Sequence, residues 1–198
     1  MSRIGIYPGT FDPIHQGHIA FALAAAKQAK LERVVLLPET QPRKKTGVTD
    51  IAHRVAMLQH AVQSFSHLQV MTLQSRQFTV GQTLPELRQH LPTAELVLLM
   101  GSDVAKTLGH HWQGLGELLR TVPLVIGMRQ DDTLSAIQSQ LNKLVADYKV
   151  PLDVMIIPST YSTLSSSHIR TLPQVPAVSD NVLGYISRHR LYGFGASQ

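Results

Sequence analysis

The chain has 198 residues, enough for one domain with its own hydrophobic core, and it contains no cysteine, which excludes disulfides and thiolate metal sites. The longest uncharged apolar run, residues 19–26, is far shorter than the roughly 20 residues that a membrane-spanning helix needs. The first residues contain no basic-then-apolar leader, so we expect a cytoplasmic protein that does not enter a membrane.

The charge balance favours a small anionic partner. Lys and Arg number 18 against 13 Asp and Glu, which gives a net charge of +5 with histidine neutral. The basic residues are spread along the chain, with one tight cluster at residues 43–45, and only 6% of the residues are aromatic. A nucleic-acid-binding protein more often carries a basic stripe with interleaved aromatics. We therefore expect small phosphorylated substrates and no nucleic-acid partner.

Short apolar runs alternate with longer amphipathic ones along the chain. In chain order the pattern predicts strand 3–7, helix 18–29, strand 33–37, helix 51–64, strand 68–73, helix 80–90, strand 95–100, helix 112–120, strand 123–127, helix 133–147 and strand 152–157. Several strands are apolar throughout, as strands buried on both faces are. The alternation predicts an α/β fold with a Rossmann-like, doubly wound parallel sheet and helices on both faces.

The C-terminal part is expected to belong to the same domain. Residues 171–180 contain Pro173 and Pro176 and precede a last predicted helix at 181–190. This segment is too short for a domain linker, so we expect a single domain, 1–198, with the last helix packed on it. Ligands of open parallel sheets bind beyond the carboxyl ends of the strands. Motifs that directly follow a strand are therefore the best candidates for a site.

The first such motif, Gly-Thr-Phe-Asp-Pro-Ile-His-Gln-Gly-His at residues 9–18, joins the first strand to an Ala-rich helix. Gly9 allows close approach of the backbone to a ligand, and a helix N-terminus attracts phosphate. His15 and His18 are three residues apart and would share a face of the first turn, with Gly17 between them. The alternative is that the histidines are incidental to a helix start. A protein zinc site is disfavoured, because zinc prefers three or four ligands.

The second motif, Thr-Leu-Ser-Ser-Ser-His-Ile-Arg at residues 163–170, follows the last predicted strand. Its serines are typical of a helix N-cap, where hydroxyls and free N–H groups meet anions. Arg170 lies four residues after Ser166, so its guanidinium could bind a phosphate from the same face. In isolation the motif is equally typical of an ordinary capped helix with a solvated arginine. Its position after a strand favours the functional interpretation.

These two motifs resemble the signatures (H/T)-x-G-H and I-S-S-T-x-I-R of the nucleotidyltransferase α/β-phosphodiesterase superfamily, and residues 100–103, Met-Gly-Ser-Asp, resemble its G-x-D. Most of the chain is similar to one branch, the bacterial nicotinate-nucleotide adenylyltransferases. Residues 41–44 resemble the P-P-H-K loop of that branch, and 50–58 its helix with an Arg followed by Met-Leu. Residues 78–84 resemble S-Y-T-x-x-T-L, Trp112 stands where the branch has a Trp, and 191–193 resemble its ending.

The resemblance implies transfer of AMP from ATP to nicotinate mononucleotide, with pyrophosphate as the second product. It implies catalytic roles for His15, His18, Lys44 and Arg170. It implies ATP contacts for Gly9, Thr10, Phe11, Gly17, Gly101, Asp103, Ser165, Ser166 and Ser167, with Asp103 on a ribose, and acceptor contacts for Phe78, Thr79 and Trp112. Mg²⁺ would arrive on the ATP rather than in a protein metal site. The partners are then ATP and a mononucleotide, and a homo-oligomer is possible.

Three departures from the branch bear on the acceptor. Gln41 and Arg43 alter the P-P-H-K loop, Ser167 replaces a Thr, and the loop at 75–79, which in that branch reads the nicotinate carboxylate through backbone groups, is shorter. The acceptor could instead be nicotinamide mononucleotide or phosphopantetheine, since residues 7–13 also resemble the opening of phosphopantetheine adenylyltransferases. A nucleotide-binding sensor without turnover is a third alternative. Trp112 would stack on a pyridine ring or belong to the core.

Overall fold

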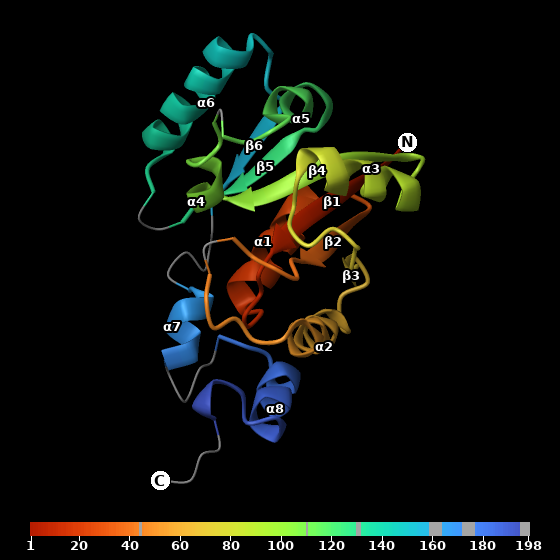
Figure 1. The fold of residues 1–198 in the computed structure, drawn as a ribbon, viewed down its shortest axis with the longest axis vertical. Coiled ribbons are helices and arrows are strands. Elements are labelled where there is room, and N and C mark those ends of the chain that lie inside the picture. Colours follow the sequence, from red (N-terminus) through yellow and green to blue (C-terminus); the bar gives the residue numbers. More distant parts are fainter. Residues whose placement is uncertain (44, 110, 130–131, 159–163, 172–176, 195–198) are drawn as a thin grey trace.

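The computed structural model describes residues 1–43, 45–109, 111–129, 132–158, 164–171 and 177–194. Its centre is a six-stranded sheet with the order β3-β2-β1-β4-β5-β6, in which every neighbouring pair is parallel (Figure 1). The strands are β1 (Ser2–Gly9), β2 (Arg33–Pro38), β3 (Leu68–Val70), β4 (Ala94–Gly101), β5 (Leu124–Gly127) and β6 (Val154–Ile157). The predicted doubly wound parallel sheet is confirmed.

Helices cover both faces of this sheet, because alternate strand residues are apolar on both sides. They are α1 (Gln16–Gln28), α2 (Ile51–Val62), α3 (Val80–His90), α4 (Ser102–Ala105), α5 (Leu115–Thr121), α6 (Leu134–Tyr148), α7 (Ser166–Thr171) and α8 (Asp180–Arg188), with a 3₁₀ turn, η1 (Leu191–Gly193). Val34 and Leu36 of β2 join a core with α1, α2 and α8. Their neighbours Val35 and Leu37 join a second core with α3, α5 and α6.

The boundaries differ from the prediction where single residues override the pattern. Helix α5 begins at Leu115 rather than at Trp112, because Gly114 takes a left-handed conformation with φ 77°. Strand β3 ends at Val70, three residues before the predicted end. Helix α4 was not predicted, since one turn of four residues has no periodicity to detect.

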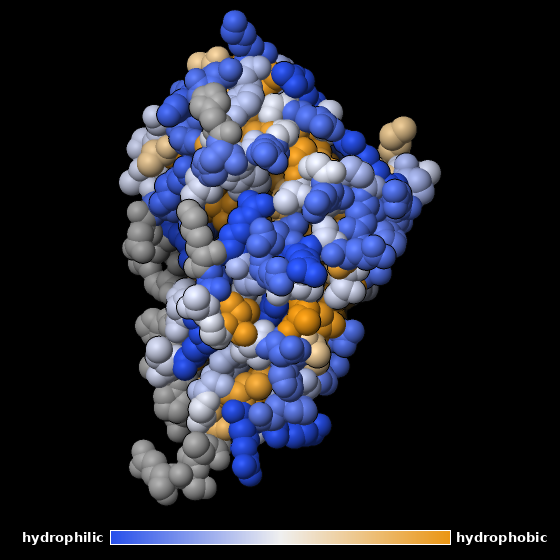
Figure 2. Space-filling view, in the orientation of Figure 1, coloured by the Kyte–Doolittle hydropathy of each residue, from blue (hydrophilic) through white to orange (hydrophobic). Residues whose placement is uncertain are grey.

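The C-terminal segment lies against the N-terminal half of the chain. Helix α8 packs on α2, where the Tyr185 hydroxyl lies 2.9 Å from His53 Nδ1. The Gln16 N–H, at the start of α1, donates to the Ala177 carbonyl at 2.7 Å. In the space-filling view this face of the molecule is mostly hydrophilic, and apolar side chains show mainly in its hollows (Figure 2). Among the described residues, no helix combines the length and the apolar character that crossing a membrane requires.

Candidate active site

A cavity of about 780 Å³ opens at the carboxyl ends of the central strands. Its walls come from the ends of β1 and β4, from the segments that follow β2 and β5, and from the start of α7. Strand β1 lies between β2 and β4, which is the point where the strand order reverses and where open α/β sheets bind ligands. The cavity has the size of a small-molecule site. Predicted residues that line it are Gly9, Thr10, Phe11, His15, His18, Phe78, Gly101, Asp103, Trp112, Ser165, Ser166, Ser167 and Arg170.

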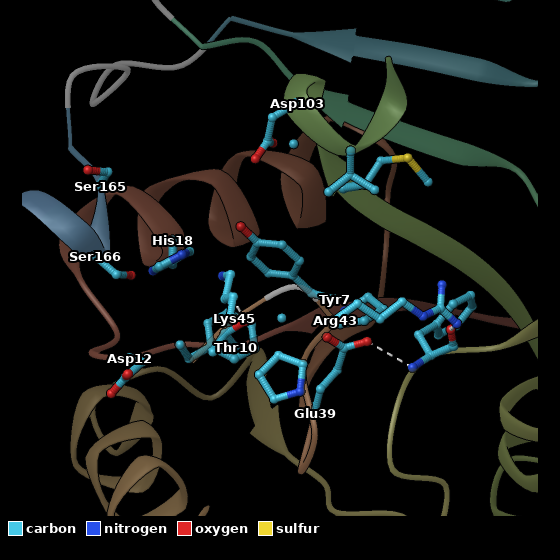
Figure 3. A pocket seen from close by; sticks show the side chains of 18 of the residues that line it. Tyr7, Thr10, Asp12, His18, Glu39, Arg43, Lys45, Asp103, Ser165 and Ser166 are labelled. Carbon is cyan, nitrogen blue, oxygen red and sulfur yellow. Dashed lines mark hydrogen bonds between the residues drawn. The ribbon is translucent and has the colours of Figure 1, made fainter. Parts of the chain in front are cut away.

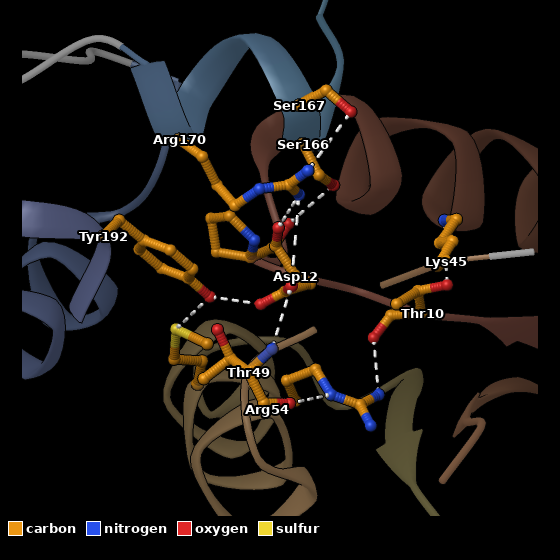
Figure 4. A network of polar contacts seen from close by, with 11 residues as sticks. Thr10, Asp12, Lys45, Thr49, Arg54, Ser166, Ser167, Arg170 and Tyr192 are labelled. Atoms are coloured by element: carbon orange, nitrogen blue, oxygen red, sulfur yellow. Dashed lines mark hydrogen bonds and ion pairs between the residues drawn. The ribbon is translucent and has the colours of Figure 1, made fainter. Parts of the chain in front are cut away.

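The two motifs, more than 140 residues apart, meet at one end of this cavity (Figure 4). The Ser166 hydroxyl donates to the Pro13 carbonyl at 3.0 Å, and Arg170 Nη1 donates to the Asp12 carbonyl at 2.7 Å. Arg170 Nη2 also lies 3.4 Å from the Ser167 hydroxyl. Helix α7 is thereby docked on the loop between β1 and α1, so that the serines and both histidines face the same space.

The histidine pair caps helix α1. His15 is the N-cap residue, and its ring stacks on that of His18 with centroids 3.6 Å apart and planes 29° apart. The His15 backbone N–H donates to His18 Nδ1 at 3.3 Å. A neutral His18 that accepts through Nδ1 carries its proton on Nε2 and has one N–H left to donate to a ligand. His15 is only 6% exposed, and its Nδ1 has no hydrogen-bond partner within the described part of the chain.

Burial lowers the pKa of His15 to about 4, with the nearby charge of Arg129 as a second cause. Burial also lowers the pKa of His18 well below its usual value, and His15, Arg129 and Lys45 add to this effect. Both imidazoles are therefore neutral at pH 7 in the free protein. A bound triphosphate would raise both pKa values, because an anion favours the charged form of an imidazole.

These pKa directions predict a loss of stability in acid. The pKa of a histidine in the unfolded chain is near 6.5, so between that pH and about 4 the unfolded state binds more protons than the native state. The free energy of unfolding should fall with pH in this window by up to about 1.4 kcal/mol per pH unit for each imidazole. Urea unfolding at pH 7, 6 and 5 measures the slope, which His15→Asn should flatten at an unchanged m-value. An identical slope in the variant would contradict the assignment.

Three further charged side chains complete the cavity wall. Lys45 Nζ donates to the Thr10 hydroxyl at 2.9 Å. Although the residue as a whole is exposed, burial of its ammonium lowers the pKa of Lys45. Arg129 Nη2 lies 3.3 Å from Asp103 Oδ2, so the carboxylate expected to bind a ribose is paired with a guanidinium. The described residues hold no group of three or more His, Asp or Glu arranged for a metal ion.

Two basic residues that were not among the predicted site residues line the cavity. Lys44, expected near the reacting phosphates, lies outside the described residues, and the adjacent Lys45 lines the cavity. Arg129 was not predicted at all. The usable signal was its place two residues after the predicted strand 123–127, since nearness to the carboxyl end of a strand also singled out the two motifs.

Of the two glycines of the first motif that were expected to contact ATP, Gly9 lines the cavity and Gly17 does not. Gly9 lies directly under the ring of Phe11, where an added Cβ would approach that ring to 2.8 Å. Phe11 itself takes a positive φ of 50° and is 2% exposed. Gly17 does not line the main cavity. It lines a small adjoining hollow of about 50 Å³ behind the histidine pair, because helix α1 turns this backbone away from the larger space.

Below the cavity, a buried arginine holds the surrounding loops together (Figure 4). Arg54 is 1% exposed, and its guanidinium donates to the carbonyls of Thr49, Thr10 and Glu39, each at 2.8 Å. These carbonyls belong to the segment just before α2, to the loop after β1 and to the segment just after β2. Arg54 is thus a positioning residue for three of the segments that form the site.

Asp12 links the same loop to the C-terminal segment. Its carboxylate accepts from the Thr49 N–H at 3.2 Å and from the Tyr192 hydroxyl at 2.6 Å. Burial, together with the hydrogen bond to Asp12, raises the pKa of Tyr192, so this hydroxyl remains a donor. Arg54 and Tyr192 lie in the segments 50–58 and 191–193 that resemble the family branch, but the sequence assigned no role to either side chain. Each has a partner far away along the chain, Thr10 for Arg54 and Asp12 for Tyr192.

The opposite end of the cavity carries the residues expected to contact the acceptor. Phe78 is 6% exposed and Trp112 is half-buried, and both line the cavity. Thr79 does not line it. Its hydroxyl accepts from the Gln82 N–H at 3.3 Å as the N-cap of α3, so its side chain is turned toward the helix instead of the cavity.

The fold and the family matched below define a nucleotidyltransferase, with a cavity at the reversal point of its parallel sheet. The chain belongs to the cytidylyltransferase-like family, which residues 6–172 match.

Two relatives of this chain match it over almost its whole length and share one name. A protein of Thermomicrobium roseum named probable nicotinate-nucleotide adenylyltransferase is 35% identical over 207 residues, which cover 97% of this chain and 92% of that protein. A protein of Neisseria gonorrhoeae with the same name is 32% identical over 201 residues, covering 97% of this chain and 99% of that protein. The resemblance found in the sequence is confirmed.

The fold is also shared with a solved structure. The Plasmodium falciparum nicotinic acid mononucleotide adenylyltransferase complexed with NaAD superposes with a TM-score of 0.78 at 18% sequence identity, over 98% of both chains. The same protein complexed with APC gives a TM-score of 0.75. At this level of identity the similarity establishes the fold alone.

Proposed function

We propose that this protein transfers AMP from ATP to nicotinate mononucleotide, forming the deamido-dinucleotide and releasing pyrophosphate. The observation that carries the proposal is the single cavity in which His15 and His18 of the early motif meet Ser166 and Arg170 of the late one. The name shared by the relatives of 32–35% identity supports the same reaction.

The chemistry needs two anions brought together and no covalent intermediate. An oxygen of the acceptor phosphate attacks the α-phosphorus of ATP in line, the bond from that phosphorus to the bridging oxygen breaks, and pyrophosphate leaves with the negative charge. Positioning and electrostatic stabilisation can supply the catalysis of such a transfer. The cavity provides the corresponding groups, namely the two imidazoles at the start of α1 and cationic side chains that include Lys45, Arg129 and Arg170.

The phosphates are best accommodated where the two motifs meet. In Figure 3, His18, Lys45 and Ser166 lie around one region of the cavity. There the Nε2–H of neutral His18 can donate to an α-phosphate oxygen, and this bond strengthens as charge develops in the transition state. Ser165, Ser166, Ser167 and Arg170 are assigned to the β- and γ-phosphates. Mg²⁺ enters as part of the ATP substrate, held by phosphates and water.

An acceptor panel tests the reaction. The protein is incubated with ATP, Mg²⁺ and, separately, nicotinate mononucleotide, nicotinamide mononucleotide or phosphopantetheine, and pyrophosphate is assayed. We expect the highest kcat/KM with nicotinate mononucleotide. Faster turnover of phosphopantetheine would assign the chain to another acceptor class. Tight ATP binding without pyrophosphate from any acceptor would support a sensor instead.

Trp112→Ala tests the position of the acceptor. Trp112 lines the cavity beside Arg43, which lies away from His18 in Figure 3. We therefore expect a raised KM for the mononucleotide and an unchanged KM for ATP. Steady-state kinetics with each substrate varied in turn separate the two effects. An equal loss for both substrates would assign Trp112 to the core.

The proposal includes a single domain over residues 1–198 that works in the cytoplasm, where ATP and mononucleotides are available. Whether the enzyme is a homo-oligomer is measured by light scattering of the purified protein.

A further inference from the structure

Opposite charges bond the two backbone polar groups of one residue, Phe78, at the acceptor end of the cavity. Glu39 Oε1 accepts from the Phe78 N–H at 2.8 Å, and Arg43 Nη2 donates to the Phe78 carbonyl at 3.1 Å. Both side chains line the cavity, and both lie at the same end of it in Figure 3, with the bond from Glu39 drawn as a dashed line. An acceptor whose ring reaches Trp112 therefore meets an anion and a cation.

The contacts of Arg43 leave its charge available to a ligand. Besides the Phe78 carbonyl, its Nε donates to Gln77 Oε1 at 2.9 Å, and its Cζ lies 6.0 Å from the centroid of the Trp112 ring. Within the described residues, no carboxylate forms an ion pair with this guanidinium. Its two bonded partners are neutral oxygens, and the side chain is exposed to the solvent of the cavity.

We propose that Arg43 recognises the carboxylate on the aromatic ring of the acceptor. The Phe78 N–H already donates to Glu39, so this backbone group does not bind the acceptor carboxylate. The inference rests on the proposed function, because it names the group that selects an acid over an amide in that site. A carboxylate replaces the neutral Gln77 oxygen on Arg43 and gains a charge-assisted, two-point contact. An amide gains no such charge, so the guanidinium favours the acid.

Glu39, in contrast to Arg43, disfavours binding of the acid acceptor. Its carboxylate cannot donate to a second carboxylate, and like charges repel when both are partly removed from water. Glu39→Gln keeps an oxygen that can accept from the Phe78 N–H but removes the charge. The acid should then bind better, and the amide should be affected little.

The test compares kcat/KM for nicotinate mononucleotide with that for nicotinamide mononucleotide, and the ratio of the two is the selectivity. We expect Arg43→Gln to lower this ratio at least about tenfold, the effect of one hydrogen bond to a charged group, with the amide value nearly unchanged. Arg43→Lys keeps the positive charge but loses the paired N–H groups of the guanidinium, so its ratio should lie between those of the wild type and Arg43→Gln. Glu39→Gln should raise the ratio.

Gln77→Ala is the matched control, because it removes the same side-chain contact to the loop and leaves the guanidinium in place. Its selectivity should equal or exceed that of the wild type. An unchanged ratio in Arg43→Gln, or an equal fall in Gln77→Ala, would overturn the proposal and assign Arg43 to the support of the loop. A wild-type protein that joins neither mononucleotide to AMP would instead refute the proposed function.

Discussion

We expect His18→Ala to lower kcat by at least ~100-fold, the loss that follows removal of one preorganised transition-state donor. The KM for ATP should change far less, because the contact strengthens mainly as charge develops on the transferred phosphorus. The structural basis is the neutral imidazole, fixed by the His15 N–H and by ring stacking at 3.6 Å, with its remaining N–H available to the cavity. Steady-state pyrophosphate release measures the effect.

The control for this variant is His18→Asn. His18 also accepts the His15 N–H at the start of α1, so alanine removes a helix cap together with the imidazole. Asparagine can accept the same N–H and restores the cap but not the catalytic donor. If His18→Asn recovered wild-type kcat, the loss in His18→Ala would come from the helix terminus. A kcat within a fewfold of wild type in both variants would remove His18 from the mechanism.

The second large effect is expected at Arg54. Arg54→Met keeps the length and volume of the side chain but leaves the carbonyls of Thr49, Thr10 and Glu39 without their donor. A buried group that loses its partner costs about 1–3 kcal/mol, so we expect the free energy of unfolding to fall by about 3 kcal/mol or more. Activity at temperatures where the variant is folded should fall too, since the three segments around the site lose their common anchor.

Chemical denaturation of Arg54→Met beside Arg76→Met measures this effect. Arg76 is exposed, so its replacement removes an arginine without breaking a buried network, and stability should change little. A loss below about 1 kcal/mol in Arg54→Met would show that water satisfies the three carbonyls, and Arg54 would then not be the anchor of the loops.

Periodicity in the sequence was sufficient to predict the sheet and most helices, because strands buried on both faces and amphipathic helices leave different patterns. It also located the two motifs, since a Gly-Thr-x-Asp-Pro turn and a serine-arginine turn both follow predicted strands. The meeting of Ser166 with Pro13 follows from the parallel topology, which brings the carboxyl ends of the strands to one edge.

Side-chain direction in irregular segments could not be predicted. Lys45 is one of three consecutive basic residues in the sequence, and the path of the loop turns its side chain toward Thr10. Thr79 matched a pattern expected at the acceptor, yet the same hydroxyl serves as the cap of α3. An arginine in an amphipathic helix is normally solvated, so the burial of Arg54 depends on carbonyls supplied by distant segments.

The most direct test of adenylyl transfer follows the α-phosphorus itself. ATP carrying a radioactive label at that position is mixed with excess enzyme, Mg²⁺ and nicotinate mononucleotide, and the products of one turnover are separated. The label should pass entirely into the dinucleotide, with one unlabelled pyrophosphate formed for each dinucleotide. Label recovered as free AMP, or bound covalently to the protein, would contradict direct transfer between two substrates held in one cavity.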